Sequence, residues 1–181
     1  MGEITQLLEQ ARTGHDGAWN QVVALLYDDL RRLAYRAGGA GRPDTLNATA
    51  LVHECYLRLS RDGGTAVTGR AHFFALAGRA MRQILANHAR DRLAAKRGGG
   101  AQRTTLDRLD IAADREAEEL AHVDAALTQL ASEDERLVRV VDCRVFGGLS
   151  EAETAEALAV SLRTVQRLWA QARERLDALL A

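Results

Sequence analysis

Apolar residues recur every three or four positions through most of the chain, a spacing that predicts amphipathic helices. Trp19, Val22, Leu26 and Leu30, for example, would share one face of a helix. Ala, Leu, Arg and Glu, all good helix formers, are abundant, and the chain holds one Pro. We therefore expect an all-α protein. The expected helices cover residues 4–11, 19–33, 51–59, 71–95, 120–130 and 137–145, with two more near the C-terminus.

A glycine run at residues 98–100 interrupts the apolar pattern, and the chain then stays polar and weakly periodic to about residue 115. Such a stretch is typical of a flexible linker between folded units. A run of Gly and Thr within residues 61–69 predicts a surface loop. At 181 residues, the chain has the length for two small domains. We expect two helical domains, residues 1–95 and 117–181, joined by a flexible linker over residues 96–116.

The net charge of -1 conceals a difference between the two halves of the chain. Sixteen Lys or Arg face eleven Asp or Glu through Asp110, whereas eight face fourteen from Ile111 onward. The first part therefore carries about +5 and the second about -6. This asymmetry indicates either a polyanionic partner for the first half or unevenly charged solvated faces. Charge alone leaves both interpretations open.

Residues 149–176 have the pattern of a helix-turn-helix. Ser150 and Glu153 form a capping-box pair, and Ser161 follows a short turn as the cap of a second helix. That helix has an apolar side and an outer side of Arg and Gln, which can bond guanine and adenine edges. The alternative is an ordinary helical hairpin with a solvated face. The candidate DNA-reading residues are Ser161, Arg163, Thr164, Gln166, Arg167 and Gln171.

The helix expected over residues 71–95 has an apolar back and a basic front. Between Arg70 and Arg103 the only acidic residue is Asp91, which favours contact with a phosphate backbone over a mixed solvated face. His72 and Phe73 lie where the preceding loop joins the helix, a place where a ring can stack on an unpaired base, although Phe73 also suits a core. The candidates on this helix are His72, Phe73, Arg79, Arg82, Gln83 and Arg90.

These features, in this order, resemble the extracytoplasmic-function (ECF) sigma factors over nearly the whole chain. The resemblance is carried by the blocks ALVHECYLRL (50–59), AHFFA (71–75), AAKRGGG (94–100), FGGLS (146–150) and RTVQRLW (163–169). It implies an alternative sigma factor that binds core RNA polymerase and directs promoter-specific transcription initiation. Sigma domain 2 would bind the polymerase clamp and the minus-ten element, sigma domain 4 the minus-thirty-five element, and the linker would thread the polymerase.

One block departs from the wider family, whose clamp-binding helix usually starts with an acidic cluster. Here those positions read NATA (47–50), without charge, and the resemblance associates such members with Ser/Thr kinase control. Phosphorylation of Thr49 would add about -1.5 to -2 charges beside a helix N-terminus, which favours negative charge. Our hypothesis is that a Ser/Thr protein kinase modifies Thr49 to license polymerase binding; the alternative is a cap or a neutral surface residue. The expected clamp contacts are Thr49, His53 and Glu54.

The sequence indicates no catalytic or metal site. The five His are scattered, and no nucleophile and base are paired. Cys55 and Cys143 are too far apart for a metal-ligand spacing, and both fit small buried apolar positions. We expect no cofactor, no metal and no enzymatic activity. The chain shows no leader and no membrane span, so we expect a cytoplasmic protein without a membrane partner. The main rival is a stand-alone helix-turn-helix regulator that binds DNA as a dimer; a helical enzyme has no supporting site.

Overall fold

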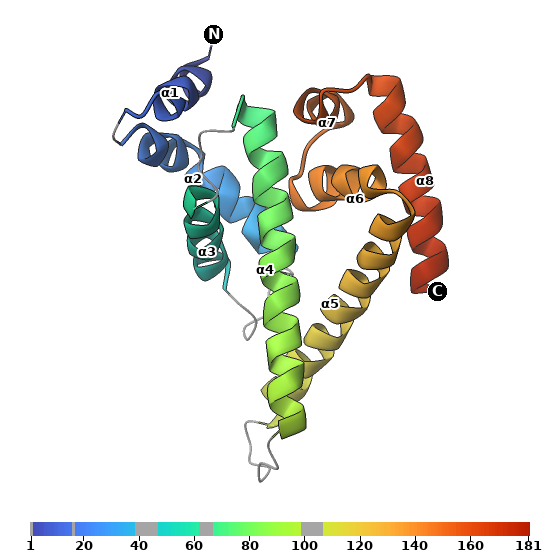
Figure 1. Ribbon diagram of the computed structural model, residues 1–181. Helices are drawn as coiled ribbons and strands as arrows, with labels where there is room; N and C mark the ends of the chain where they lie inside the picture. Colours follow the sequence, from blue (N-terminus) through green and yellow to red (C-terminus); the bar gives the residue numbers. More distant parts are fainter. Residues whose placement is uncertain (1, 16, 39–46, 62–66, 99–106) are drawn as a thin grey trace.

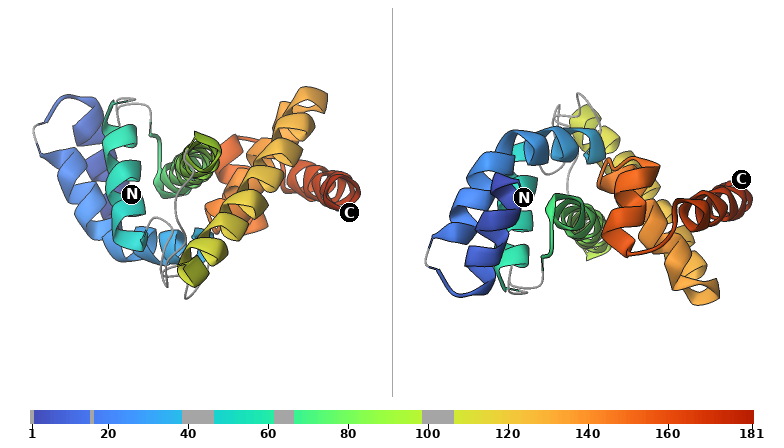
Figure 2. Two further views of the ribbon diagram at one scale, coloured as in Figure 1. Left: turned by 90° about the horizontal axis from the view of Figure 1, so that it is seen from below. Right: turned by 90° about the horizontal axis from the view of Figure 1, so that it is seen from above.

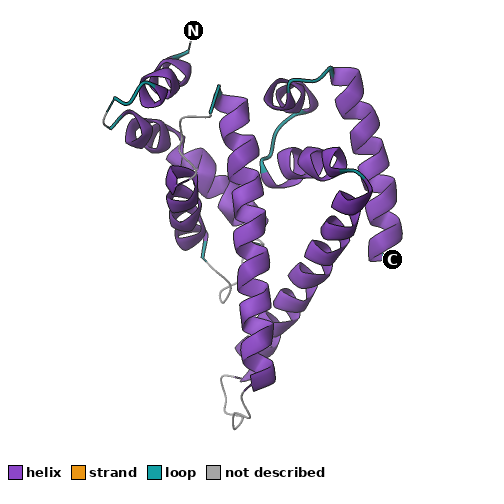
Figure 3. Ribbon diagram, in the orientation of Figure 1, coloured by secondary structure: helices purple, strands orange, loops and turns teal. Residues whose placement is uncertain are grey.

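A computed structural model describes residues 2–15, 17–38, 47–61, 67–98 and 107–181. These described residues form helices and connecting turns and contain no strand, which confirms the expected all-α class (Figure 3). Most of the helices were expected from the apolar spacing. The helix expected over residues 137–145 is divided into an α-helical and a π-helical segment. The elements are α1 (Glu3–Arg12), α2 (Ala18–Ala37), α3 (Ala48–Arg61), α4 (Arg70–Gly98), α5 (Asp107–Glu133), α6 (Glu135–Val141), the π-helical η2 (Asp142–Phe146), α7 (Glu151–Leu158) and α8 (Leu162–Leu180).

The long helix α4 lies between the two groups of helices (Figure 1). On one side are α1, α2 and α3, and on the other are α5 to α8. The views from below and from above show the same arrangement (Figure 2). α4 packs against α3 with one face and against α5, η2 and α7 with another, so both sides of this helix are covered by protein.

The first core fills the space between α4 and the three N-terminal helices. Leu26, Leu51 and Met81 are at most 2% exposed there, and Phe73 is fully buried with its ring against Trp19 at a centroid distance of 5.8 Å. Cys143 and Leu149, which come from the second half of the chain, are buried in the same cluster. Burial raises the pKa of Cys143, and that of Cys55 in the same core, to about 12.

The second core lies between α5, α6 and α8. Leu127, Leu130 and Val140 are at most 2% exposed, and Val165 and Leu168 bring α8 onto them. This cluster contains no residue from α1 to α4. Each half of the chain therefore has an apolar core of its own. Cys143 and Leu149 of the second half extend the first core, and Ala157 and Leu158 pack against it.

The expected linker is helical wherever the structure describes it, which corrects our expectation of a flexible segment through residue 116. Residues 96–98 end α4 and residues 107–116 begin α5, whereas residues 99–106 lie outside the described part of the chain. Ala113 and Ala117 are buried, and α5 packs along α4. Small side chains allow such close packing, and their weak apolar signal explains why the periodicity did not indicate this helix.

Replacing Phe73 by Ala tests the first core. The variant is expected to lower the free energy of unfolding by about 3–5 kcal/mol, because the whole ring leaves a cavity between Trp19 and Phe74. The matched control is Leu25→Ala, at a site 49% exposed on α2, which is expected to stay within about 0.5 kcal/mol of the parent. Urea unfolding followed by circular dichroism measures both. Equal midpoints for the two variants would contradict this assignment of the core.

Candidate nucleic-acid interface

The helix-turn-helix is built by α7, α8 and the turn between them. The N–H of Ser150 donates to Glu153 Oε2 at 2.9 Å, and Ser150 Oγ accepts from the N–H of Glu153 at 3.2 Å, which confirms the capping box. Ala159 has φ 53° and ψ 43°, so the turn uses the left-handed region without a glycine. Ser161 caps α8 as expected, with its Oγ accepting from the N–H of Thr164 at 3.1 Å.

The outer side of α8 is open to solvent. Val165, Leu168 and Ala172 are buried in the second core, which turns the opposite side of the helix outward. Ser161 and Thr164 bond each other through their hydroxyls at 2.8 Å, so these two candidates serve first to shape the helix start. The remaining four candidates are exposed on one helix: Arg163, Gln166, Arg167 and Gln171.

Part of the basic front of α4 is paired with carboxylates of the second half of the chain. The Nε of Arg82 donates to Asp142 Oδ1 at 2.5 Å and its Nη2 donates to Oδ2 at 3.2 Å. Asp124 on α5 lies 3.6 Å from Arg82 Nη1 and accepts from Arg90 Nη1 at 3.0 Å. The Arg82 side chain is only 14% exposed, so a group that the sequence assigned to DNA is enclosed by carboxylates.

The same pairing continues toward the C-terminal end of α4. The Nε of Arg92 donates to Asp114 Oδ1 at 2.9 Å, and Lys96 Nζ lies 3.3 Å from Asp114 Oδ2. Four cations of α4 thus face three aspartates that follow them in the chain. We call this set the clasp: Arg82, Arg90, Arg92 and Lys96 with Asp114, Asp124 and Asp142.

The other candidates on α4 have different environments. Phe73 belongs to the core and its ring is out of reach of a base, which corrects its assignment to the minus-ten contact. His72 is half-buried, its Nδ1 accepts from the N–H of Thr68 at 3.2 Å, and desolvation lowers its pKa. Gln83 is half-buried, whereas Arg79 is exposed.

The candidate polymerase contacts lie on α3. Asn47 caps this helix, with its Oδ1 accepting from the N–H of Ala50 at 2.8 Å, so the suggestion that Thr49 is the cap is wrong. Thr49 is exposed in the first turn, which has no acidic residue, and His53 is exposed one turn later.

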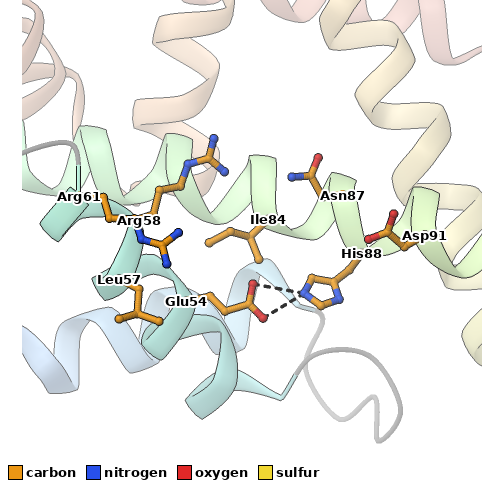
Figure 4. A pocket seen from close by; sticks show the side chains of 8 residues that line it. All are labelled: Glu54, Leu57, Arg58, Arg61, Ile84, Asn87, His88 and Asp91. Atoms are coloured by element: carbon orange, nitrogen blue, oxygen red, sulfur yellow. Dashed lines mark hydrogen bonds and ion pairs between the residues drawn. The ribbon is translucent and has the colours of Figure 1, made fainter.

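A groove of about 520 Å³ runs beside these contacts, between α3 and α4 (Figure 4). Glu54 of α3 and His88 of α4 meet across it, with Glu54 Oε1 3.1 Å from His88 Nε2. This pair ties the expected clamp-contact helix to α4. The groove is lined by Glu54, Leu57, Arg58, Arg61, Ile84, Asn87, His88 and Asp91.

The acidic members of the clasp were missed by sequence reasoning. Asp142 is buried, and this burial raises its pKa while Arg82 and Arg79 oppose the shift. One sequence signal for this packing was present: Gly78, a small residue within the basic front of α4. Gly78, one turn before Arg82, would place a Cβ 2.5 Å from the backbone nitrogen of Gly147, so this position requires glycine.

The chain was compared with known proteins in three ways. A comparison with curated proteins gives no match. The chain is similar to the solved structure of CnrH in complex with the cytosolic domain of CnrY, with 23% identity and a TM-score of 0.45 over 97% of this chain and 96% of that one. The family model for ECF sigma factors matches residues 1–181. In the described residues no helix is long and apolar enough to cross a membrane. The chain belongs to the ECF sigma factor family.

Proposed function

We propose that this alternative sigma factor reads promoter DNA through α8 and α4 and contacts core RNA polymerase through α3. Family membership supplies the two partners, core polymerase and promoter DNA, and the role in transcription initiation. The observation that carries the residue assignment is the exposed Arg and Gln side of α8 after a capped turn. We take residues 1–95 as sigma domain 2 and residues 117–181 as sigma domain 4, supported by the two apolar cores.

Reading of the minus-thirty-five element is assigned to the outer side of α8. Arg163 and Arg167 lie one turn apart on this side, and each guanidinium can bond a guanine edge in two places. Gln166 and Gln171 have the donor and acceptor that an adenine edge requires. The amides at the start of α8, shaped by Ser161, suit a DNA phosphate.

Contact with the minus-ten element is assigned to the front of α4. Positive charge for the DNA backbone comes from Arg79, Arg82 and Arg90. On the same helix, His72 lies near the start, beside the loop, and Gln83 lies near the middle. Arg82 and Arg90 are engaged by the clasp, so this contact requires that the second half of the chain move away.

The clamp contact is assigned to Thr49, His53 and Glu54. A phosphate on Thr49 would supply the negative charge that the missing acidic cluster provides in the wider family. Three observations support a modification site: the side chain is exposed, another residue provides the cap, and the first turn of α3 has no acidic group. A phosphate there would meet the positive end of the helix dipole. The kinase would be a Ser/Thr protein kinase.

The stand-alone regulator that binds DNA as a dimer is the less favoured alternative, because the family match covers the whole chain. An in vitro transcription assay distinguishes a sigma factor from a stand-alone regulator. Core polymerase is given genomic DNA and either the unmodified chain or Thr49→Glu, and at least one of the two forms is expected to produce new transcripts with defined start sites. A regulator without sigma activity gives no such transcripts with core enzyme alone, and that result would refute the proposal.

Substitution at Thr49 tests the phosphate. Thr49→Glu is expected to strengthen binding to core polymerase roughly tenfold, about 1.4 kcal/mol, whereas Thr49→Ala stays as weak as the unmodified chain. Binding is measured by anisotropy of labelled protein titrated with core enzyme. The matched control is Thr13→Glu, which adds the same charge at an exposed position after α1. Equal affinities for the Glu and Ala variants at residue 49 would remove the phosphate from the account.

Loss of an outer arginine tests the reading helix. Arg163→Ala or Arg167→Ala is expected to reduce minus-thirty-five-dependent transcription about 5- to 150-fold, because a bidentate base contact contributes about 1–3 kcal/mol. Arg12→Ala, which removes an exposed arginine from α1, is the charge-matched control and is expected to have no effect. Quantitative run-off assays on promoters with an intact and a scrambled minus-thirty-five element measure this. Loss that is independent of that element would show that α8 does not read it.

A further inference from the structure

We propose that Glu151 is a positioning residue that sets the base preference of the reading helix: it holds the amide of Gln166 in the orientation that suits adenine. The inference deepens the proposed function and rests on it, because it requires that α8 read the minus-thirty-five element. Glu151 lies on α7, the helix before the turn. Through this residue, the first helix of the helix-turn-helix would contribute to the specificity of the second.

Glu151 and Gln166 meet across the two helices of the helix-turn-helix. The Nε2 of Gln166 donates to Glu151 Oε2 at 3.1 Å, although the two residues are 15 positions apart in the chain. Gln166 is exposed on the outer side of α8, and Glu151 is half-buried at the start of α7. The bond therefore lies at the edge of the surface proposed to face DNA, where it restricts a side chain that would otherwise sample several rotamers.

Packing holds the two helices that carry this pair. Thr154, one turn after Glu151, is fully buried, and so is Val165, the residue before Gln166. Ala155 packs against the second core, to which Val165 belongs, and α7 packs against α8. Buried neighbours on both helices therefore determine how far apart the two polar side chains begin.

The two carboxylates in the first turn of α7 have different partners. Glu153 accepts from the backbone N–H of Ser150 and closes the capping box. Glu151 has no part in that cap, and its Oε2 accepts from a side chain of the next helix instead. A glutamate that serves only the helix dipole requires no such partner. The geometry therefore indicates a task for Glu151 beyond the stability of α7.

The chemistry of the pair determines which way the amide faces. A carboxylate has acceptors only, so the NH2 group of Gln166 must face Glu151, and the carbonyl oxygen of the amide must face away. One N–H donor and the Oε1 acceptor then remain for a base. An adenine edge in the major groove matches these two groups, because its N7 accepts and its N6 amino group donates. A guanine edge offers two acceptors, N7 and O6, and would place one of them against Oε1.

Two substitutions of Glu151 separate its hydrogen bond from its charge. Glu151→Gln removes the charge and keeps a carbonyl oxygen that can accept from Gln166, whereas Glu151→Ala removes both. The control Glu156→Ala takes the same charge from an exposed site on the same helix. A residue that acts only through its charge changes DNA binding without regard to sequence, because charge acts on the phosphates.

The hydrogen bond is tested in the free protein, without polymerase or promoter. The side-chain NH2 signals of Gln166 and Gln171 are recorded in proton–nitrogen correlation spectra and assigned by their loss in Gln166→Ala and Gln171→Ala. Glu151→Ala is expected to shift the Gln166 signal and to leave that of Gln171 in place, and Glu156→Ala is expected to move neither. A Gln166 signal that Glu151→Ala does not move would overturn the inference, because the bond would then be absent in solution.

Base preference at the promoter tests the reading itself. Run-off transcription is measured with core polymerase and the form of the chain that is active on genomic DNA. The templates are a promoter recovered from that reaction and all its single base-pair substitutions across the minus-thirty-five element. The position that Gln166 contacts is the one at which Gln166→Ala loses discrimination.

At that position the parent chain is expected to favour adenine over guanine about 5- to 150-fold, the range of a bidentate contact. Glu151→Ala is expected to reduce this preference about 3- to 10-fold, the effect of one hydrogen bond, whereas Glu151→Gln and Glu156→Ala keep it. A preferred base other than adenine, an unchanged preference in Glu151→Ala, or an equal loss in Glu151→Gln would overturn the inference, and so would a Gln166→Ala variant that loses no discrimination. Absence of transcripts from every form of the chain would instead refute the proposed function, and the inference with it, whatever the amide signals show.

Discussion

The buried pair of Arg82 and Asp142 determines how the two halves of this molecule meet. A buried guanidinium needs a partner, and Asp142 provides it at the end of α6, where the π-helical η2 begins. Gly78 and Gly147 allow the backbones to approach closely enough for this contact. Once it forms, α5 lies along α4 and its aspartates reach the remaining cations. Separately, burial of Val165, Leu168 and Ala172 in the second core turns the outer side of α8 toward solvent.

The three surfaces proposed to bind DNA or polymerase, on α8, α3 and α4, differ in how far they are exposed to solvent. The Arg and Gln side of α8 and the first turn of α3 are exposed, whereas the front of α4 is engaged. The proposed minus-ten contact therefore requires a rearrangement around Arg82, and the proposed clamp contact Glu54 is paired with His88. Three of the fourteen acidic residues of the second half, Asp114, Asp124 and Asp142, pair with cations of α4 in the clasp.

Local features were predictable from the sequence, and long-range ones were not. Ser150, Glu153 and Ser161 act on amides within three residues of themselves, so their spacing alone reveals the caps. The partners of Arg82 lie 42 and 60 positions away, and the amphipathic pattern of α4 does not show what covers its polar face. An aromatic residue beside a loop suits either a core or a base, and only packing assigns Phe73 to the core.

The most direct test of this account is the solution shape of the free, unmodified chain at low salt. Small-angle X-ray scattering reports whether the two halves stay together without any label or substitution. We expect one compact species whose scattering agrees with the arrangement in Figure 1, with α5 packed against α4. A curve that requires two separated domains in most molecules would show that the clasp does not hold the free protein closed.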